Sequence, residues 1–143
     1  MSEPFRCELQ VRWGDSDRLG HVNNVMYLEY AQEARLRFFR AIFDGTDTGS
    51  VGPVVVRRLE VDFERSLTDE SDPLSVEVTV TKLGRTSMTI RNRMFDRHGV
   101  LHSTVDAVLV ALDMATNTPR PIPDEAREVL LAYSEETLVR AAT

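Results

Sequence analysis

The feature that most constrains this chain is a long helix-forming stretch, residues 24–43, that follows directly on a short polar loop. Apolar or small residues recur in this stretch with a 4-3-4-3 spacing, which places them on one face of a helix. These residues are Tyr27, Ala31, Ala34, Phe38 and Ala41. Neighbouring apolar residues widen the face, so the sequence predicts a buried helix with only a narrow polar stripe: Glu29, Glu33, Arg37 and Arg40. Within that stripe, Glu33 is expected to pair with Arg37 one turn later.

Most of the remaining chain alternates between apolar and polar residues, which is the pattern of half-buried strands. Strands are expected at residues 5–13, 54–65, 74–83, 86–95 and 100–112. In the second of these, Leu59, Val61 and Phe63 are expected to face the core. Residues 44–53 are rich in glycine and are expected to form a mobile loop, and Asp124 is expected to cap a short amphipathic helix at 125–138.

The expected order is therefore one strand, one core helix and four consecutive antiparallel strands, which together make an α+β fold. By its length, the chain is expected to be a single domain over residues 1–143. Strands of about ten residues are roughly 33 Å long and twist strongly, so the sheet should curl around the helix. Such a sheet keeps exposed edges, and pairing in a homodimer is a simple way to protect them.

Charge and composition exclude some classes of partner. The net charge of −6 and the pI near 5.1 argue against nucleic acid, because nucleic-acid binding needs a clustered basic surface. A single cysteine, Cys7, has no internal disulfide partner, and no apolar run approaches the length of a membrane span. The chain is accordingly expected to be cytoplasmic.

The polar loop before the helix, residues 14–23, contains the candidate chemistry. Asp17 is the candidate reacting carboxylate, because an aspartate can attack an activated acyl carbon, such as that of a thioester, or act as a base. Asn23 or Asn24 can cap the helix. The free backbone N–H of Asn24 or Val25 could then stabilise negative charge on the thioester oxygen.

The residues of this loop can also be interpreted in other ways. Asp15 and Asp17 could simply be loop caps, which is a common use of aspartate. A calcium loop fails because Leu19 and Met26 occupy positions that need oxygen ligands. A transition-metal site on Asp15, Asp17 and His21 is disfavoured because no second His or Cys lies at ligand spacing, so no metal is expected. No G-x-S-x-G motif surrounds Ser16, which argues against a serine hydrolase.

The run D-S-D-R-L-G-H-V-N-N-V-M-Y-L-E-Y-A-Q-E-A-R resembles the signature of hotdog-fold acyl-CoA thioesterases of the 4-hydroxybenzoyl-CoA thioesterase-like family. The later L-G-R-T-S and P-R-P-I-P-D-E are similar too, so the resemblance covers nearly the whole chain. It implies a helix wrapped by a five-stranded antiparallel sheet, and dimers that pair two sheets edge to edge, often within a tetramer. It also implies hydrolysis of an acyl-CoA or an acyl-carrier-protein thioester at the dimer interface. Coenzyme A would be part of the substrate, and no separate cofactor is expected.

The resemblance assigns roles to particular residues. The catalytic aspartate of the family falls on Asp17 and its helix amide on about Asn24. His21 and Asn23 are expected to shape the loop or hold a water, and Tyr27 to line the substrate site. Where the family members that act on aromatic substrates have apolar or aromatic residues after the motif glycine, this chain has H-V-N-N. This difference favours an aliphatic acyl group.

Arginines that could bind the phosphates of coenzyme A occur on or beside the later strands, because guanidinium groups bind phosphate bidentately. They are Arg57, Arg58, Arg85, Arg91 and Arg93. Arg85 is the best candidate, because Thr86 and Ser87 follow it at a strand turn. Two other functions stay open: a hotdog hydratase or dehydratase acting on acyl thioesters, and a non-enzymatic acyl-CoA binder.

Overall fold

The computed structural model describes residues 3–45 and 49–142. Its helices are α1 (Asn24–Ile42), α2 (Asp124–Leu131) and α3 (Glu135–Ala142), with short 3₁₀ turns at Trp13–Asp15, Gly49–Val51 and Asp69–Ser71. Its strands are β1 (Phe5–Leu9), β2 (Val54–Phe63), β3 (Leu74–Leu83), β4 (Ser87–Phe95), β5 (Leu101–Asp113) and the two-residue β6 (Thr118–Pro119). Residues 46–48 of the predicted loop lie outside the described residues.

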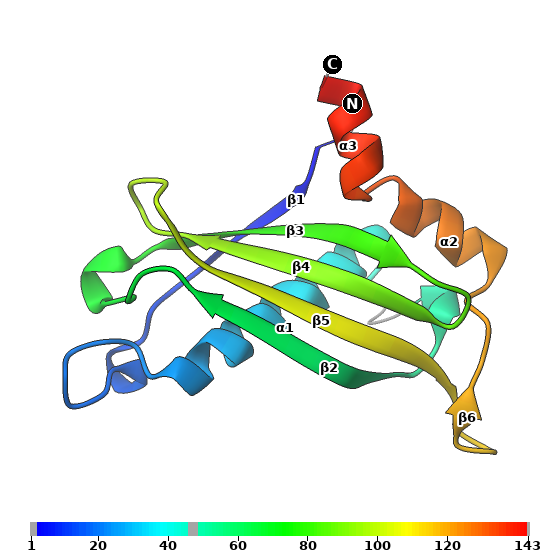
Figure 1. Ribbon diagram of the computed structural model, residues 1–143, viewed down its shortest axis with the longest axis horizontal. Helices are drawn as coiled ribbons and strands as arrows, with labels where there is room; N and C mark the ends of the chain where they lie inside the picture. The colour runs from blue at the N-terminus through cyan, green and yellow to red at the C-terminus, as the bar shows by residue number, and fades with distance from the viewer. Residues whose placement is uncertain (1–2, 46–48, 143) are drawn as a thin grey trace.

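The sheet has the order β1-β3-β4-β5-β2, with every pair antiparallel and β6 added to β5. It curls around one side of α1, and α2 and α3 lie near the end of β3 (Figure 1). This is the predicted hotdog architecture of a long helix and a five-stranded antiparallel sheet. The strands at 74–83, 86–95 and 100–112 were predicted to within one residue at each end.

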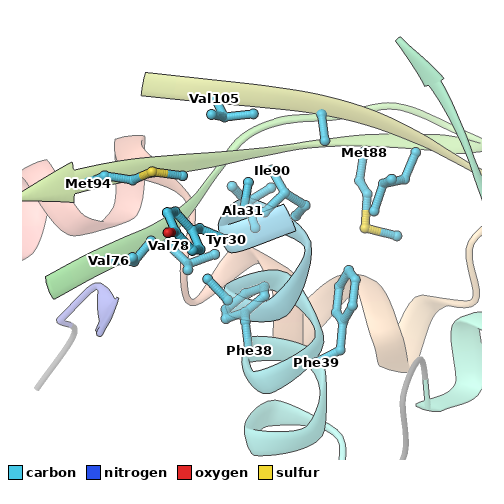
Figure 2. Close-up of a cluster of buried hydrophobic side chains, with 14 of the residues drawn as sticks. Tyr30, Ala31, Phe38, Phe39, Val76, Val78, Met88, Ile90, Met94 and Val105 are labelled. Atoms are coloured by element: carbon cyan, nitrogen blue, oxygen red, sulfur yellow. The ribbon is translucent and has the colours of Figure 1, made fainter. Parts of the chain in front are cut away.

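The core lies between α1 and the concave face of the sheet. Phe38 and Ala34 of α1 are completely buried, and Figure 2 shows the helix side chains packed against residues of β3, β4 and β5. The predicted inward residues of β3 and β4 are all buried: Leu74, Val76, Val78, Val80, Met88, Ile90 and Met94. Glu33 and Arg37 form the expected ion pair at 2.9 Å.

The helix is less completely buried than its sequence predicts. Val25 and Leu36 are 58% and 37% exposed, and Ala41, expected on the buried face, is exposed. The reason is that one curled sheet covers only one side of α1 within a single chain. Arg35, by contrast, is only 8% exposed.

The first strand is shorter than the predicted 5–13. β1 ends at Leu9 because its partner β3 begins at Leu74, which pairs with Leu9. Beyond that point the N–H of Val11 donates to the Asp72 carboxylate at 2.6 Å instead of to a strand. Trp13, which ends the alternating pattern of the predicted strand, is 90% exposed.

The second strand occupies the edge of the sheet, and its core-facing residues are incompletely covered. Leu59 and Phe63 pair with Ala107 and Ser103, which are buried, so their side chains lie on the helix side of the sheet. They are nevertheless 42% and 52% exposed, so the expectation that they lie in the core is wrong for a single chain. An edge strand has no neighbour on its outer side to cover it.

The C-terminal region forms two helices, whereas one was predicted. The helix stops after Leu131 because the N–H of Val80 takes the Tyr133 carbonyl as its acceptor at 2.9 Å. Ser134 directly precedes α3, and its hydroxyl accepts from the N–H of Thr137. Pro123, not Asp124, is the N-cap of α2, and Asp124 is its first helical residue. Among the described residues, no helix is long and apolar enough to cross a membrane.

Candidate active site

The loop that precedes α1 folds back on itself as a narrow hairpin. Ser16 and Val22 form an isolated antiparallel bridge, and the N–H of Asp17 donates to the His21 carbonyl at 2.7 Å. Gly20 closes the turn with a φ of +77°, a backbone conformation that residues other than glycine rarely adopt. The hairpin therefore presents Asp17 and His21 side by side, next to the start of the helix.

The Asp17 carboxylate partly caps this loop and partly stays available. Its Oδ1 accepts hydrogen bonds from the N–H groups of Leu19 at 2.9 Å and His21 at 3.3 Å. Within the described residues, Oδ2 has no hydrogen-bond donor, and the side chain is exposed in the single chain. The capping interpretation thus holds for one oxygen, and the other is free to act on a ligand.

The start of α1 leaves one particular N–H group without an acceptor. Asn23 is the N-cap: its side-chain oxygen accepts from the N–H of Val25 at 3.2 Å, and its carbonyl accepts from Met26 at 2.8 Å. Of the two predicted oxyanion donors, Val25 is therefore already engaged. The N–H of Asn24 meets no acceptor in the described part of the chain, so Asn24 is the available donor.

A pocket of about 320 Å³ joins these groups. Asp17, His21, Asn24 and Tyr27 line it on the loop and helix side, and Phe63 on the β2 side. Val22, Glu64, Arg65 and Ser66 complete its wall. Four of the five residues predicted in this region thus share one cavity, whereas Asn23 acts behind it as the helix cap.

Tyr27 supports the far wall of this pocket. Its ring lies 4.9 Å from that of Phe63, and its hydroxyl accepts from the N–H of Leu67 at 2.9 Å. Only 3% of Tyr27 is exposed, and burial raises the pKa of its phenol above the ordinary value. A neutral Tyr27 thereby holds the segment after β2 against the first turns of α1.

Asp15 has a role that its sequence neighbours did not reveal. The side chain is buried, and its Oδ2 accepts from the Tyr30 hydroxyl at 2.6 Å and from Nε of Arg12 at 3.1 Å. Burial alone would raise the pKa of Asp15, but the hydrogen bonds from Tyr30 and Arg12 outweigh it and keep the pKa below its usual value. The Asp15 carbonyl also accepts from the N–H of Asn23 at 2.8 Å.

Asp15 therefore ties the base of the hairpin to the second turn of α1. The sequence signal was Tyr30, which sits on the apolar side of a helix and needs a hydrogen-bond partner when buried.

Tyr30→Phe is expected to lower turnover several-fold with little change in KM, because the Asp17 hairpin loses one anchor. Steady-state kinetics beside a thermal melt checks this; a fall in Tm that explains the whole loss would contradict it.

Arg85, Thr86 and Ser87 lie away from the pocket within one chain. Ser87 pairs with Val110, near the strand end where Val54 pairs with Ala111, whereas Phe63 belongs to the opposite end of β2. The turn between β3 and β4 is held by Arg127, which donates to the Gly84 carbonyl at 2.8 Å. A single chain thus does not bring these predicted phosphate-binding residues together with Asp17.

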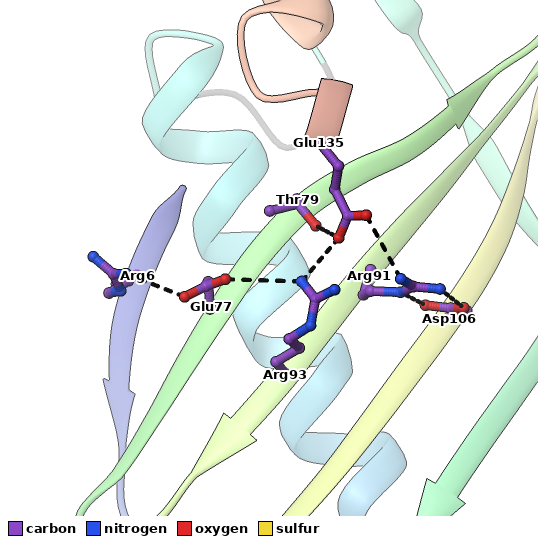
Figure 3. A network of polar contacts seen from close by, with 7 residues as sticks. All are labelled: Arg6, Glu77, Thr79, Arg91, Arg93, Asp106 and Glu135. Carbon is purple, nitrogen blue, oxygen red and sulfur yellow. Dashed lines mark hydrogen bonds and ion pairs between the residues drawn. The ribbon is translucent and has the colours of Figure 1, made fainter. Parts of the chain in front are cut away.

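Two other candidate arginines are engaged on the convex face of the sheet. Arg91 forms a bidentate pair with Asp106 at 2.8 and 2.9 Å, and Arg93 contacts Glu135 of α3 at 2.8 Å. Figure 3 shows this network, which also includes Arg6, Glu77 and Thr79. Among the described residues no cluster of three or more His, Cys, Asp or Glu side chains could hold a metal ion.

A family model and several solved structures are similar to this chain over most of its length. A model of the thioesterase-like superfamily matches residues 11–130. A Thermus thermophilus thioesterase, solved with coenzyme A and zinc, is 36% identical, with a TM-score of 0.77 and coverage of 90% of this chain and 92% of that one. An acyl-CoA thioesterase candidate from Xanthomonas campestris is also 36% identical, with a TM-score of 0.68 and coverage of 77% and 93%.

A third structure, a predicted thioesterase from Bacillus stearothermophilus, is 25% identical, with a TM-score of 0.81 and coverage of 92% and 97%. The residues matched by the family model include the hairpin, α1 and strands β2 to β5. This chain belongs to the thioesterase-like superfamily and has its hotdog-type fold.

Proposed function

We propose that this protein is an acyl-CoA thioesterase that hydrolyses an aliphatic acyl-CoA to the free acid and coenzyme A. The observation that carries the proposal is that Asp17 and the start of α1 line one pocket, where the Asn24 N–H has no acceptor among the described residues. A carboxylate and an amide donor facing the same space are what attack on a thioester carbonyl requires. The complex of the Thermus thermophilus relative with coenzyme A supports this substrate class.

In the proposed mechanism the thioester oxygen accepts a hydrogen bond from the Asn24 N–H. Oδ2 of Asp17 either attacks the carbonyl carbon, giving a mixed anhydride that water then cleaves, or removes a proton from an attacking water. In both routes negative charge develops on the thioester oxygen beside the positive end of α1. The carbon–sulfur bond then breaks, coenzyme A leaves as thiolate, and the thiolate takes up a proton.

The exposed edge of β2 supports a homodimer. No strand of the described residues pairs with its outward backbone, and apolar side chains along the strand are exposed: Val55, Val56, Leu59 and Phe63. The other edge, β1, has only five residues. Antiparallel pairing of two β2 strands would join the sheets into one and cover these side chains.

The same pairing would complete the substrate site. Antiparallel β2 strands place the Val54 end of one chain beside the Phe63 end of the other. The β3–β4 turn of the partner subunit, at residues 84–87, would then lie at the end of the sheet where the Asp17 pocket is. Arg85, Thr86 and Ser87 could thus bind the phosphates of a coenzyme A whose thioester lies beside Asp17 of the neighbouring protomer. Two such dimers could associate further into a tetramer.

Leu59→Glu tests the dimer, because Leu59 lies near the middle of β2 and the change would place two carboxylates close to the symmetry axis. We expect a monomer in size-exclusion chromatography with light scattering, and a fall in kcat/KM of at least about tenfold. Leu131→Glu is the matched control, since Leu131 is similarly exposed at 45% but lies on α2. A dimeric, fully active Leu59→Glu protein would contradict this interface.

Thiol release from a panel of straight-chain and aromatic acyl-CoAs tests the activity itself. A thioesterase releases a free thiol, which a chromogenic disulfide detects. A hydratase instead changes the absorbance of an enoyl-CoA without releasing thiol. Wild-type protein that releases thiol from no member of the panel would overturn the proposal.

A further inference from the structure

Arg35, in the middle of α1, is a largely buried arginine that has no counter-ion among the described residues. The side chain is 8% exposed, and no described residue forms an ion pair or a hydrogen bond with its guanidinium. Burial lowers the pKa of this arginine, and no carboxylate of the described residues opposes the effect. The arginines on the convex face of the sheet differ, because Arg91 and Arg93 contact acidic side chains directly.

No Arg35 nitrogen is among the fully buried side-chain atoms that lack a hydrogen-bond partner, so the guanidinium reaches the surface while most of the side chain is enclosed. A charge that is partly removed from water is still costly, and such charges in proteins are normally paired. A guanidinium cannot escape this cost by losing its proton under ordinary conditions. Its planar donors match a carboxylate in bidentate geometry. Arg35 is therefore suited to an anion that approaches from outside the described part of the chain.

Arg35 lies on the side of α1 that also carries Asn24, a residue of the Asp17 pocket. Asn24, Leu28, Ala31 and Arg35 follow a 4-3-4 spacing, so they share one side of α1, and Asn24 lines the pocket. The two ends of this row are eleven residues apart, which is about 16 Å along the helix. The arginine side chain also leans back toward the start of the helix, which shortens the distance to the pocket.

In the single chain, the surface opposite this side of α1 is apolar and open. Tyr27 contacts Phe63, which shows that this side of the helix begins over β2. Val56, Leu59 and Phe63 form the helix-facing side of β2 and are 46%, 42% and 52% exposed. Glu60 and Asp62 pair with Asp106 and Thr104 and so lie on the opposite face of the strand. A second β2 strand would thus offer apolar side chains here, with no carboxylate for Arg35.

We propose that Arg35 binds a carboxylate at the far end of the acyl group, so that the preferred substrates are CoA thioesters of aliphatic dicarboxylic acids. This inference rests on the proposed thioesterase activity. The thioester lies at Asp17 and Asn24, the methylene chain runs along the helix-facing side of β2, and the distal carboxylate pairs with Arg35. Pairing also removes the cost of the isolated charge, which gives the free dicarboxylate a measurable effect on stability.

The kinetic test compares thioesters of matched length that differ only in the distal group: octanoyl-CoA against suberoyl-CoA, and decanoyl-CoA against sebacoyl-CoA. For the wild type we expect kcat/KM to be at least about tenfold higher with the carboxylate. In Arg35→Met this preference should vanish while hydrolysis of octanoyl-CoA persists, and Arg35→Lys should restore part of it. Lys82→Met, an exposed charge on β3, is the matched control and should retain the preference.

The stability test does not depend on turnover. Without ligand, Arg35→Met should melt at or slightly above the temperature of the wild type, because a partly buried, unpaired charge is replaced by an apolar chain. Free suberate should raise the Tm of the wild type and leave that of Arg35→Met unchanged. Octanoate should change the Tm of the two proteins by the same amount.

The outcomes separate this inference from the proposed function. If no acyl-CoA releases thiol, the thioesterase proposal fails, and the suberate melts alone decide whether Arg35 binds a carboxylate. Equal rates on neutral and carboxylated thioesters, with normal turnover, overturn the inference and leave the thioesterase standing. A lower Tm or a monomeric state for Arg35→Met would show that a carboxylate of the protein pairs with Arg35, which also overturns it.

Discussion

Replacing Asn24 with proline is expected to lower kcat by about a hundredfold to a thousandfold while leaving the fold intact, because it deletes one oxyanion donor. Asn24 is the first residue of α1, a position that tolerates proline well because its N–H makes no intrahelical bond. The preceding residue, Asn23, has φ −57° and ψ 134°, which a following proline accepts without strain. Single-turnover thiol release measures the effect on the chemical step.

The matched control is Asn24→Ala, which removes the same side chain but keeps the N–H. It should stay within a few-fold of wild type, and circular dichroism with a thermal melt should show all three proteins folded. Near-normal activity in Asn24→Pro would exclude this amide from catalysis. A comparable loss in Asn24→Ala would shift the role to the asparagine side chain.

Asp17→Asn is expected to reduce turnover by about a hundredfold to ten-thousandfold, since it removes the acting carboxylate. An asparagine oxygen can still accept from the N–H groups of Leu19 and His21, so the hairpin keeps its cap. The loss should therefore appear in kcat, with an unchanged melting temperature. Stopped-flow and steady-state thiol release would both report it.

Asp113 provides the control for this substitution. Its Oδ1 caps a turn in the same way, accepting from the N–H of Ala115 at 2.9 Å, but it lies at the end of β5 and outside the pocket. Asp113→Asn should therefore be fully active. If Asp17→Asn were equally active, capping would be the only function of Asp17, and the chemistry would need another group.

The sequence predicted the parts of the fold that depend on local periodicity. Alternation placed β3, β4 and β5 almost to the residue, and the 4-3-4-3 spacing placed α1, whose cap is Asn23, one of the two predicted asparagines. Asp17, His21, Asn24 and Tyr27 share a pocket because they are close in the chain. Short-range spacing is enough to bring such residues together.

Features that depend on distant partners could not be predicted. The end of β1 is set by where β3 begins, and the break between α2 and α3 depends on the Val80 N–H. The Asp15–Tyr30 bond joins residues that no local pattern pairs. The burial of Arg35 follows from how α1 lies across the sheet, whereas its sequence context is that of an ordinary helical arginine.

The contact between Tyr27 and Phe63 joins the first turns of the core helix to the edge strand. In the proposed dimer, association of the subunits and binding of substrate in the catalytic cavity would therefore be energetically coupled. Because such coupling is reciprocal, dimer formation would strengthen substrate binding, and bound substrate would strengthen the dimer by the same free energy. Specific activity should thus fall as the enzyme is diluted below its dissociation constant, and a bound substrate analogue should hold the two subunits together.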